Sequence, residues 1–256
     1  MWDPQQYDVY ADERSRPFHE LLARVPAKGP RQVVDLGCGN GALTATLAQR
    51  WPAASVLGVD SSPEMLADAA GRELPGRLAF QLGGIESWQP GRALDVLVSN
   101  AALQWVPGHG DLLGRLVSWL APGGWLAFQV PGNFGFPSHT ILAALCRAPR
   151  WSDRLGGLAG RTAAVLEPAG YLGRLATLGC QVDAWETTYL HVRSGADPVL
   201  DWVRGSALRP VLAALGGDAA DFEQEYAAQL RAAYPAQPYG TVFPFRRLFV
   251  VARRPA

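Results

Sequence analysis

The feature that most constrains this chain is a glycine-rich turn that follows a short apolar run. Residues 33–37 (VVDLG) are typical of a buried strand, and residues 41–51 have the apolar spacing of a helix. Gly37, Gly39 and Gly41 lie at the junction, where they let the backbone bend tightly and approach a ligand that a Cβ atom would repel. A strand, a glycine turn and a helix in this order predict a ligand site at the edge of an open sheet.

A second predicted strand, residues 55–60 (SVLGVD), ends on an acidic side chain. The acid follows the glycine turn by about 20 residues, the spacing at which a carboxylate accepts hydrogen bonds from ribose hydroxyls. Asp60 is therefore predicted to bind a ribose. Ser61 or Ser62 then caps the next helix, because a serine hydroxyl accepts from the free N–H groups of a first helical turn.

The glycine pattern alone leaves the ligand open. Gly37-x-Gly39-x-x-Ala42 also satisfies the dinucleotide pattern G-x-G-x-x-G/A, so an NAD(P)-dependent oxidoreductase is one interpretation. The chain has no Tyr-x-x-x-Lys pair, and its single lysine, Lys28, precedes the first strand. A tight turn that binds no ligand is a further interpretation.

Strand and helix patterns continue to alternate through the first half of the chain. Residues 78–82, 95–99 and 125–130 have the apolar character of strands. An amphipathic helix is predicted over 111–124, where Pro-Gly-Gly stops it. This alternation predicts an α/β fold with a mostly parallel sheet covered by helices on both faces.

The pattern changes after residue 131. A strand is predicted over 180–192 and a last strand over 243–252, and the segment between them reads as helical. We therefore expect one domain over 1–256, with a helical lid insertion at about 195–235. Its other parts are an N-terminal helix at about 3–25 and a Rossmann-like core at about 30–190 and 241–254.

Composition excludes several classes of protein. Lys and Arg total 23 and Asp and Glu total 23, and this net charge of zero disfavours a nucleic-acid partner. Cys38, Cys146 and Cys180 form no CxxC pair, which argues against a disulfide scaffold or a metal site. The polar start lacks a signal peptide, and no apolar run approaches the roughly 20 residues of a membrane span. We expect a cytoplasmic protein without a metal, a membrane or an obligatory protein partner.

The turn resembles the first motif of class I methyltransferases that use S-adenosylmethionine (SAM). The matching segments are DLGCGNG, SNAALQW after the fourth strand and LAPGGWLAF before the fifth. The resemblance implies a seven-stranded Rossmann-like sheet, with Asp35 helping to hold the methionine moiety of SAM and Asp60 holding its ribose. The cofactor contacts that we place on this basis are Asp35, Gly37, Gly39, Gly41, Asp60, Ser61 and Asn100.

One position departs from that family's pattern. The family often has an acidic residue after the third strand, where it accepts a hydrogen bond from the adenine amino group. Here Gly84 stands at that point, and Glu86 follows two residues later. Adenine is then expected to contact the backbone of Ile85 and the apolar side chain of Met65.

Further segments resemble the trans-aconitate 2-methyltransferase family in particular. They are WDPQQYDVYADERSRPFHELLARVP, RWPAASVLGVDSSPEML, SNAALQWVPGH, QVPGNFGFPSH and FPFRRLFVVA. The resemblance runs nearly end to end and implies methyl transfer from SAM to one carboxylate of trans-aconitate, a small polycarboxylate. Because a carboxylate is already ionised at pH 7, its attack on the methyl group needs no general base. We therefore predict no catalytic acid or base.

A tricarboxylate requires cationic partners. Arg14 and Arg16 lie on the predicted N-terminal helix, where Arg14 can hold the SAM carboxylate and Arg16 a substrate carboxylate. A solvated helix face is the alternative. Arg246 and Arg247 begin the last strand, and if that strand is antiparallel they lie at the ligand edge. Strand alternation then turns only one of them inward, unless both sit on the rim of the sheet.

Polar and aromatic residues after two strands complete the predicted substrate site. Gln104 can donate to a carboxylate and Trp105 can exclude water, with core packing as the alternative for Trp105. His139 leaves the fifth strand at the crevice edge, whereas His109 is better explained as a turn or cap residue. The predicted substrate contacts are Arg16, Gln104, Trp105, His139, Arg246 and Arg247.

Two other functions stay open at this stage. A methyltransferase can act on a different small acid, an amine or a phenol, and an amine or phenol usually requires a general base. A non-catalytic protein that only binds SAM would carry the same glycine turn and acid.

Overall fold

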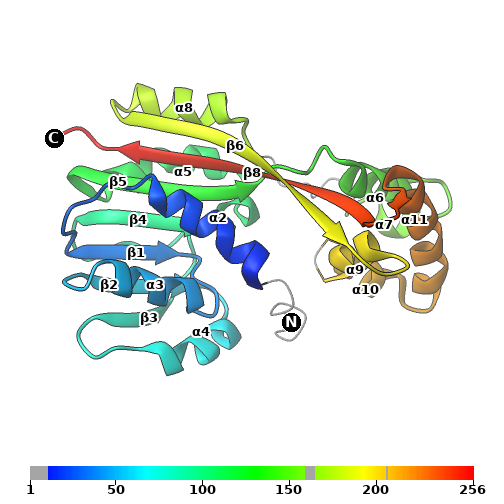
Figure 1. The fold of residues 1–256 in the computed structure, drawn as a ribbon, viewed down its shortest axis with the longest axis horizontal. Helices are drawn as coiled ribbons and strands as arrows, with labels where there is room; N and C mark the ends of the chain where they lie inside the picture. The colour runs from blue at the N-terminus through cyan, green and yellow to red at the C-terminus, as the bar shows by residue number, and fades with distance from the viewer. Residues whose placement is uncertain (1–10, 159–164, 206) are drawn as a thin grey trace. The chain divides into compact units, whose positions relative to one another are not determined.

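The computed structural model describes residues 11–158, 165–205 and 207–256, and it divides the chain into two compact units (Figure 1). We call the larger one the sheet unit; it comprises Asp12–Pro131, Ala164–Thr187 and Arg247–Ala256. We call the smaller one the helical unit; its described residues are Ala11, 132–158, 188–205 and 207–246.

The sheet has the strand order β3-β2-β1-β4-β5-β8-β6. Its strands are β1 (Gln32–Leu36), β2 (Ser55–Asp60), β3 (Leu78–Leu82), β4 (Leu94–Asn100), β5 (Leu120–Pro131), β6 (Gln181–Arg193) and β8 (Gly240–Arg253). The pairs among β1 to β5 are parallel, and β8 is antiparallel to β5. A two-residue strand, β7 (Ala236–Gln237), pairs with β8. The predicted seven-stranded, mostly parallel sheet is thus confirmed, with β7 as a short addition.

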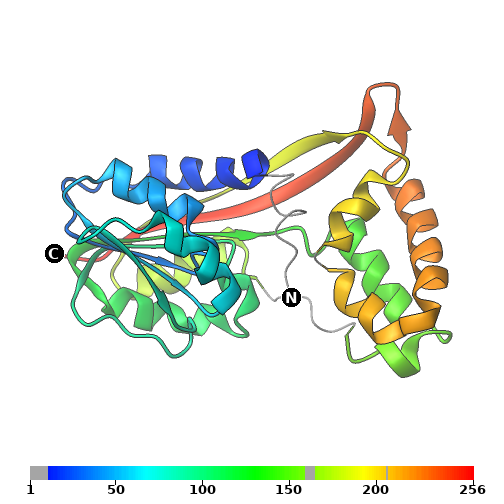
Figure 2. The ribbon, with the colours of Figure 1, turned by 90° about the horizontal axis from the view of Figure 1, so that it is seen from below.

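Helices cover both faces of the sheet in the larger unit. They are α2 (Ala11–Ala23), α3 (Ala42–Arg50), α4 (Pro63–Ala69), α5 (His109–Ser118) and α8 (Pro168–Thr177), with short 3-10 turns η1 (Ala70–Arg72) and η2 (Leu103–Trp105). Figures 1 and 2 show α2 and α3 on one face and α5 and α8 on the other. The central strands are near-continuous apolar runs because both of their faces are buried. Among the described helices, none is long and apolar enough to cross a membrane.

The helix predicted over 111–124 is shorter than expected. It ends at Ser118, and strand β5 begins at Leu120, which pairs with Leu94 ahead of a register shift. Pro122, Gly123 and Gly124 therefore lie within the irregular start of β5 rather than at a helix stop. Gly123 has a φ of 73°, a conformation that a glycine adopts easily in such a bulge.

The helical unit is built from α6 (Pro137–Arg147), α7 (Ser152–Leu155), α9 (Pro198–Arg204), α10 (Arg209–Leu215) and α11 (Ala219–Ala233), with the 3-10 turn η3 (Gly216–Asp218). Its core includes Leu142 and Leu145 from α6 and Phe222 and Tyr226 from α11. Because α6 packs against α11, the segment from Gly132 onward belongs with these helices. That placement differs from the predicted core range of about 30–190, which includes this segment.

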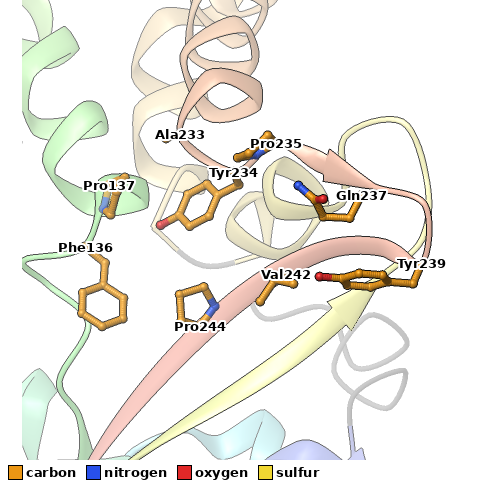
Figure 3. Close-up of a pocket in the computed structure, with 9 residues that line it drawn as sticks. All are labelled: Phe136, Pro137, Ala233, Tyr234, Pro235, Gln237, Tyr239, Val242 and Pro244. Carbon is orange, nitrogen blue, oxygen red and sulfur yellow. The ribbon is translucent and has the colours of Figure 1, made fainter.

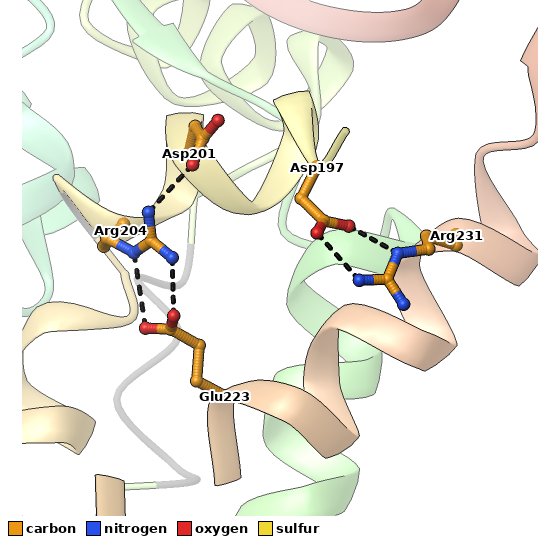
Figure 4. A network of polar contacts seen from close by, with 5 residues as sticks. All are labelled: Asp197, Asp201, Arg204, Glu223 and Arg231. Atoms are coloured by element: carbon orange, nitrogen blue, oxygen red, sulfur yellow. Dashed lines mark hydrogen bonds and ion pairs between the residues drawn. The ribbon is translucent and has the colours of Figure 1, made fainter. Parts of the chain in front are cut away.

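Exposed ion pairs link α11 to the α9 segment of this unit (Figure 4). Arg231 donates from Nε and Nη2 to the two carboxylate oxygens of Asp197, at 2.6 and 2.7 Å. Arg204 bridges Glu223 and Asp201. Bidentate pairs of this kind fix the geometry of neighbouring helices, although their exposure limits the energy that they contribute.

Candidate functional site

The carboxyl ends of β1 and β4 define the candidate site. These two strands are neighbours in the sheet. From β1 the chain adds β2 and β3 on one side, and from β4 it adds β5 on the other side. In open parallel sheets, ligands bind in the crevice where the strand order changes direction in this way. The glycine turn leaves β1 at this edge, and Ala101 follows β4 there.

The three glycines of the turn have two different kinds of surroundings. A Cβ atom at Gly37 would lie 2.2 Å from the Cβ of Ala102, and one at Gly41 would lie 2.5 Å from the ring of Phe80. The protein's own side chains therefore close both positions. A Cβ atom at Gly39 would meet nothing within 4 Å. Gly39 is the glycine of the turn that faces open space, where a ligand can approach the backbone.

Asp60 links the end of β2 to the glycine turn. Its Oδ2 accepts a hydrogen bond from the Gly39 backbone N–H at 2.8 Å, and its Oδ1 accepts from the Ser62 N–H at 2.9 Å. Ser62 caps α4 through its hydroxyl, whereas Ser61 is exposed. Each carboxylate oxygen keeps acceptor capacity beyond these bonds, so the half-buried Asp60 can still receive two hydroxyl donors.

Asp35 lies in β1 and is 3% exposed, and its Oδ2 accepts from the Thr44 hydroxyl at 2.7 Å. Burial raises the pKa of Asp35 to about 6, the Thr44 hydrogen bond opposes that shift, and the nearby charge of Asp60 adds to it. Burial is also the main cause that raises the pKa of the Cys38 thiol, and the charges of Asp35 and Asp60 add to this shift. The edge therefore has a negative potential that favours a cationic ligand.

The predicted adenine contacts lie beside the turn. Gly83 donates its N–H to the carbonyl of Asp60 at 2.8 Å, which brings the end of β3 against the end of β2. Ile85 and Met65 are both half-buried. The Ile85 side chain reaches to 3.8 Å from the Cβ position of Gly37. Its carbonyl accepts from Arg115 Nη2 at 3.1 Å and keeps capacity for a second donor.

The exit of β4 has an uncommon backbone conformation. Ala101 has a φ of 52°, in the left-handed region that non-glycine residues rarely adopt. Gln104 is buried and donates from Nε2 to the Ala101 carbonyl at 2.6 Å. The side-chain oxygens of Asn100 and Gln104 are buried without a hydrogen-bond partner in the described part of the chain. Trp105 is 65% exposed, which excludes the alternative that it packs in the core.

The two arginines of β8 differ in burial. Arg247 is 7% exposed, whereas Arg246 is half-buried. Nη1 of Arg247 lies 3.4 Å from Oε1 of Gln129 in β5. Arg247 belongs to the sheet unit and Arg246 to the helical unit.

Three other predicted residues are not brought to this edge by any described contact. Arg16 is exposed on α2, where its Nε lies 2.7 Å from Oε1 of Glu20. The side chain of Arg14 lies outside the described residues. His139 belongs to the helical unit, where its Nε2 lies 3.0 Å from Nδ2 of Asn133, and burial lowers its pKa to about 4.

His109 is an interior residue at the start of α5 rather than a loop or capping residue. It begins α5 and is 1% exposed, and its Nε2 lies 2.6 Å from the hydroxyl of Tyr171. The same hydroxyl accepts from the Leu166 N–H at 3.2 Å, which leaves its own proton free to be donated. Burial lowers the pKa of His109, with a backbone hydrogen bond to Val106 opposing that shift.

Sequence reasoning missed two polar residues of the sheet unit. Thr44 holds Asp35, and its position in α3 gives no signal beyond a helical polar residue. Gln129 is fully buried, although it stands within the apolar run WLAFQV. A single amide in such a run is the signal that was available, because an unsatisfied buried amide is costly.

A separate cavity of about 530 Å³ lies within the helical unit (Figure 3). It is lined by Phe136, Pro137, Ala233, Tyr234, Pro235, Gln237, Tyr239, Val242 and Pro244. None of these is a predicted site residue.

Comparisons with known proteins agree with the geometry of the sheet unit. Residues 33–124 match a family model described as a methyltransferase domain. The crystal structure of the YcgJ protein from Bacillus subtilis has the same fold, with a TM-score of 0.59 and 14% identity over 93% of this chain and 99% of that one. Residues 33–124 therefore contain a methyltransferase domain.

Curated relatives narrow this class further. A trans-aconitate 2-methyltransferase of Streptomyces avermitilis is 54% identical over 262 residues, which cover 100% of this chain and 97% of the relative. One of Mycobacterium tuberculosis is 49% identical over 98% of this chain and 96% of its own length. This chain belongs to the trans-aconitate 2-methyltransferase family. SAM is its cofactor, and the nicotinamide interpretation is excluded.

Proposed function

We propose that this protein transfers a methyl group from SAM to one carboxylate of trans-aconitate, giving a monomethyl ester and S-adenosylhomocysteine. The relatives are trans-aconitate 2-methyltransferases, and this supports trans-aconitate as the substrate. The observation in this chain that carries the proposal is the buried guanidinium of Arg247, a permanent cation on a sheet that is otherwise largely apolar. A small acid is the ligand class that such a cation favours.

The residues at the β1 and β4 edge fit SAM. The backbone at Gly39 is open to a ligand, and Asp60 retains acceptor capacity for the two ribose hydroxyls. Asp35 and Asp60 favour a positive charge close by. When bound, SAM supplies an electrophilic methyl group on a positively charged sulfur. The cofactor contacts we propose are Asp35, Gly37, Gly39, Gly41, Asp60, Ser61, Met65, Ile85, Asn100 and Arg14.

The acceptor acid is bound by cations and amides in this proposal. Arg247 holds a carboxylate, and Gln104 and Trp105 lie after β4, where they orient the acid and exclude water. His139 is neutral at pH 7 because its pKa is about 4, so it contributes a hydrogen bond rather than a charge. The complete set of acceptor contacts we propose is Arg16, Gln104, Trp105, His139, Arg246 and Arg247.

No residue of the chain needs to remove a proton in this reaction. The acceptor carboxylate is ionised at pH 7, so the protein aligns its oxygen with the methyl group and strips water from it. Alignment alone supplies roughly 7–11 kcal/mol in favourable cases. His109 is buried in the core, where it contacts Tyr171.

We also propose that the protein acts in the cytoplasm, without a membrane, a nucleic acid or an obligatory protein partner. Its three cysteines are free and buried, which suits a reducing compartment.

The test is incubation of the protein with methyl-labelled SAM and a panel of di- and tricarboxylic acids, followed by mass spectrometry. We expect labelled monomethyl trans-aconitate as the main product. A different labelled ester would show that another acid is the substrate. A labelled amine or phenol from a wider panel would contradict the base-free reaction. SAM binding without any labelled product would indicate a non-catalytic protein.

A further inference from the structure

Gln129 is a buried amide that the reaction described above does not use. It lies in β5, where it pairs with Asn100 of β4 and Phe249 of β8, and it is fully buried. Its neighbours in the strand are apolar residues such as Phe128 and Val130. Burial of an amide is costly unless its donors and acceptors are all satisfied, so Gln129 requires a specific explanation.

Arg247 fixes the orientation of this amide. A guanidinium can only donate hydrogen bonds, so the atom of Gln129 that faces Nη1 of Arg247 at 3.4 Å must be the oxygen, Oε1. The Nε2 group of Gln129 then points elsewhere. It is buried without a hydrogen-bond partner among the described residues. The amide whose oxygen contacts the guanidinium of Arg247 therefore also carries an N–H donor that is available to a ligand.

The register of the sheet places this pair on one face near its ligand edge. Arg247 pairs with Pro131, the last residue of β5, and Gln129 is two residues earlier on the same face. Asn100, which pairs with Gln129, is the last residue of β4. On the β5 side of the β1 and β4 crevice, Gln129 lies one strand beyond β4 and Arg247 lies two strands beyond it.

We propose that Gln129 and Arg247 together bind one carboxylate of the acceptor acid, and that this carboxylate is not the one that becomes methylated. This inference rests on the proposed function. One carboxylate oxygen accepts from Nε2 of Gln129, and the guanidinium of Arg247 neutralises the charge. Methylation of the same carboxylate would remove its charge and weaken its bond to Arg247, so the pair serves binding rather than the transfer itself.

The test is calorimetric binding of trans-aconitate to the protein loaded with S-adenosylhomocysteine. The variants are Gln129→Leu, which removes the donor, and Gln129→Glu, which places a second carboxylate beside Arg247. Ser99→Ala is the control, because Ser99 is equally buried in the neighbouring strand and loses one hydrogen bond to the Leu36 carbonyl. Circular dichroism and the affinity for S-adenosylhomocysteine report whether each variant is folded.

We expect Gln129→Leu to weaken trans-aconitate binding at least about tenfold, the value of one hydrogen bond to a charged group. Gln129→Glu should weaken it further by repulsion. The affinity for S-adenosylhomocysteine should change less than about threefold in both variants, and the control should retain wild-type binding of both ligands. With saturating acid, kcat should stay within about threefold of the wild type.

Three results would overturn the inference. Unchanged acid binding in both variants would show that the amide is satisfied by a buried water or by Asn100 only. A loss confined to S-adenosylhomocysteine would assign the pair to the cofactor's carboxylate. A large fall in kcat at saturating acid would assign it to the reacting carboxylate. A wild-type protein that binds the acid without methylating it would instead refute the proposed function and leave the binding pair in place.

Discussion

The backbone N–H of Gly39 donates to Oδ2 of Asp60 across 2.8 Å. The glycine that faces open space and the acid at the end of β2 are thus joined by a hydrogen bond within the protein. A site whose carboxylate is already oriented loses less conformational freedom when a ribose arrives, which favours tight cofactor binding. Changes at Asp60 or Gly39 should therefore impair cofactor binding.

Replacement of Asp60 by Asn should weaken SAM binding at least about tenfold, because hydrogen bonds to a charged acceptor contribute about 1.5–3 kcal/mol each. Isothermal titration calorimetry with SAM measures the effect. Asp95→Asn is the matched control, since Oδ2 of Asp95 accepts from the N–H groups of Arg31 and Gln32 near the start of β4. Equal loss of SAM affinity in both variants would show that Asp60 acts only on the fold.

Gly39→Ala should impair SAM binding more than stability, whereas Gly37→Ala should mainly impair stability. The Cβ atom at Gly39 meets no neighbour, so that variant should fold with a loss of about 1 kcal/mol from its positive φ, yet bind SAM poorly. At Gly37 the clash with Ala102 should destabilise the protein itself. Thermal unfolding and SAM titration of both variants check this, and a Gly39→Ala protein with wild-type affinity would refute the open approach.

Asp35→Asn should stabilise the ligand-free protein at neutral pH while it weakens SAM binding. The folded protein holds the Asp35 proton up to about pH 6, against an ordinary value of 3.8, so it binds more protons than the unfolded chain within that window. Stability due to this group therefore falls as pH rises from about 4 to 6 and stays low above it. Removal of the charge should restore up to about 3 kcal/mol at pH 8 and much less at pH 4.5.

Chemical denaturation of the wild type and the Asp35→Asn variant at the two pH values measures that difference. A stability difference that is the same at both pH values would show that the ionisation of Asp35 is not the cause.

His109→Ala should lower stability by about 2–4 kcal/mol but retain most of the activity of the folded enzyme, because it removes a buried ring and a hydrogen bond to Tyr171. Tyr171→Phe is the control, since it removes the same bond and leaves the imidazole in place. Initial rates at a temperature where both variants are folded test the prediction. A loss of about a thousandfold in His109→Ala alone would indicate proton abstraction and contradict the base-free reaction.

Arg247→Ala should raise the KM for the acid more than it changes the affinity for SAM, because we propose that this buried cation binds the acid and not the cofactor. Steady-state kinetics with each substrate varied in turn separates the two effects. An unchanged KM for the acid would show that Arg247 does not bind it.

The parts that the sequence predicted are those encoded by local patterns. The glycine turn, the acid of β2 and the apolar strands each occupy a few consecutive residues, so their structure depends little on distant contacts. The difference in burial between Arg247 and Arg246 also agrees with strand alternation.

The parts that the sequence missed depend on contacts between distant segments. Pro-Gly-Gly reads as a helix stop, but pairing of Leu120 with Leu94 draws it into β5. The association of α6 with α11 is equally non-local, since the hydroxyl of Tyr226 donates to the carbonyl of Ser138 and the N–H of Ser138 donates to Tyr234. Gln129 gave only the signal of one polar residue in an apolar strand.

The most direct measurement is a crystal structure of the protein with S-adenosylhomocysteine and trans-aconitate. The account predicts that the ribose hydroxyls donate to the carboxylate of Asp60, that the backbone of Gly39 contacts the ligand, and that the acid lies on the Arg247 side of the crevice. A cofactor bound elsewhere, or one that leaves Asp60 without a contact, would contradict it.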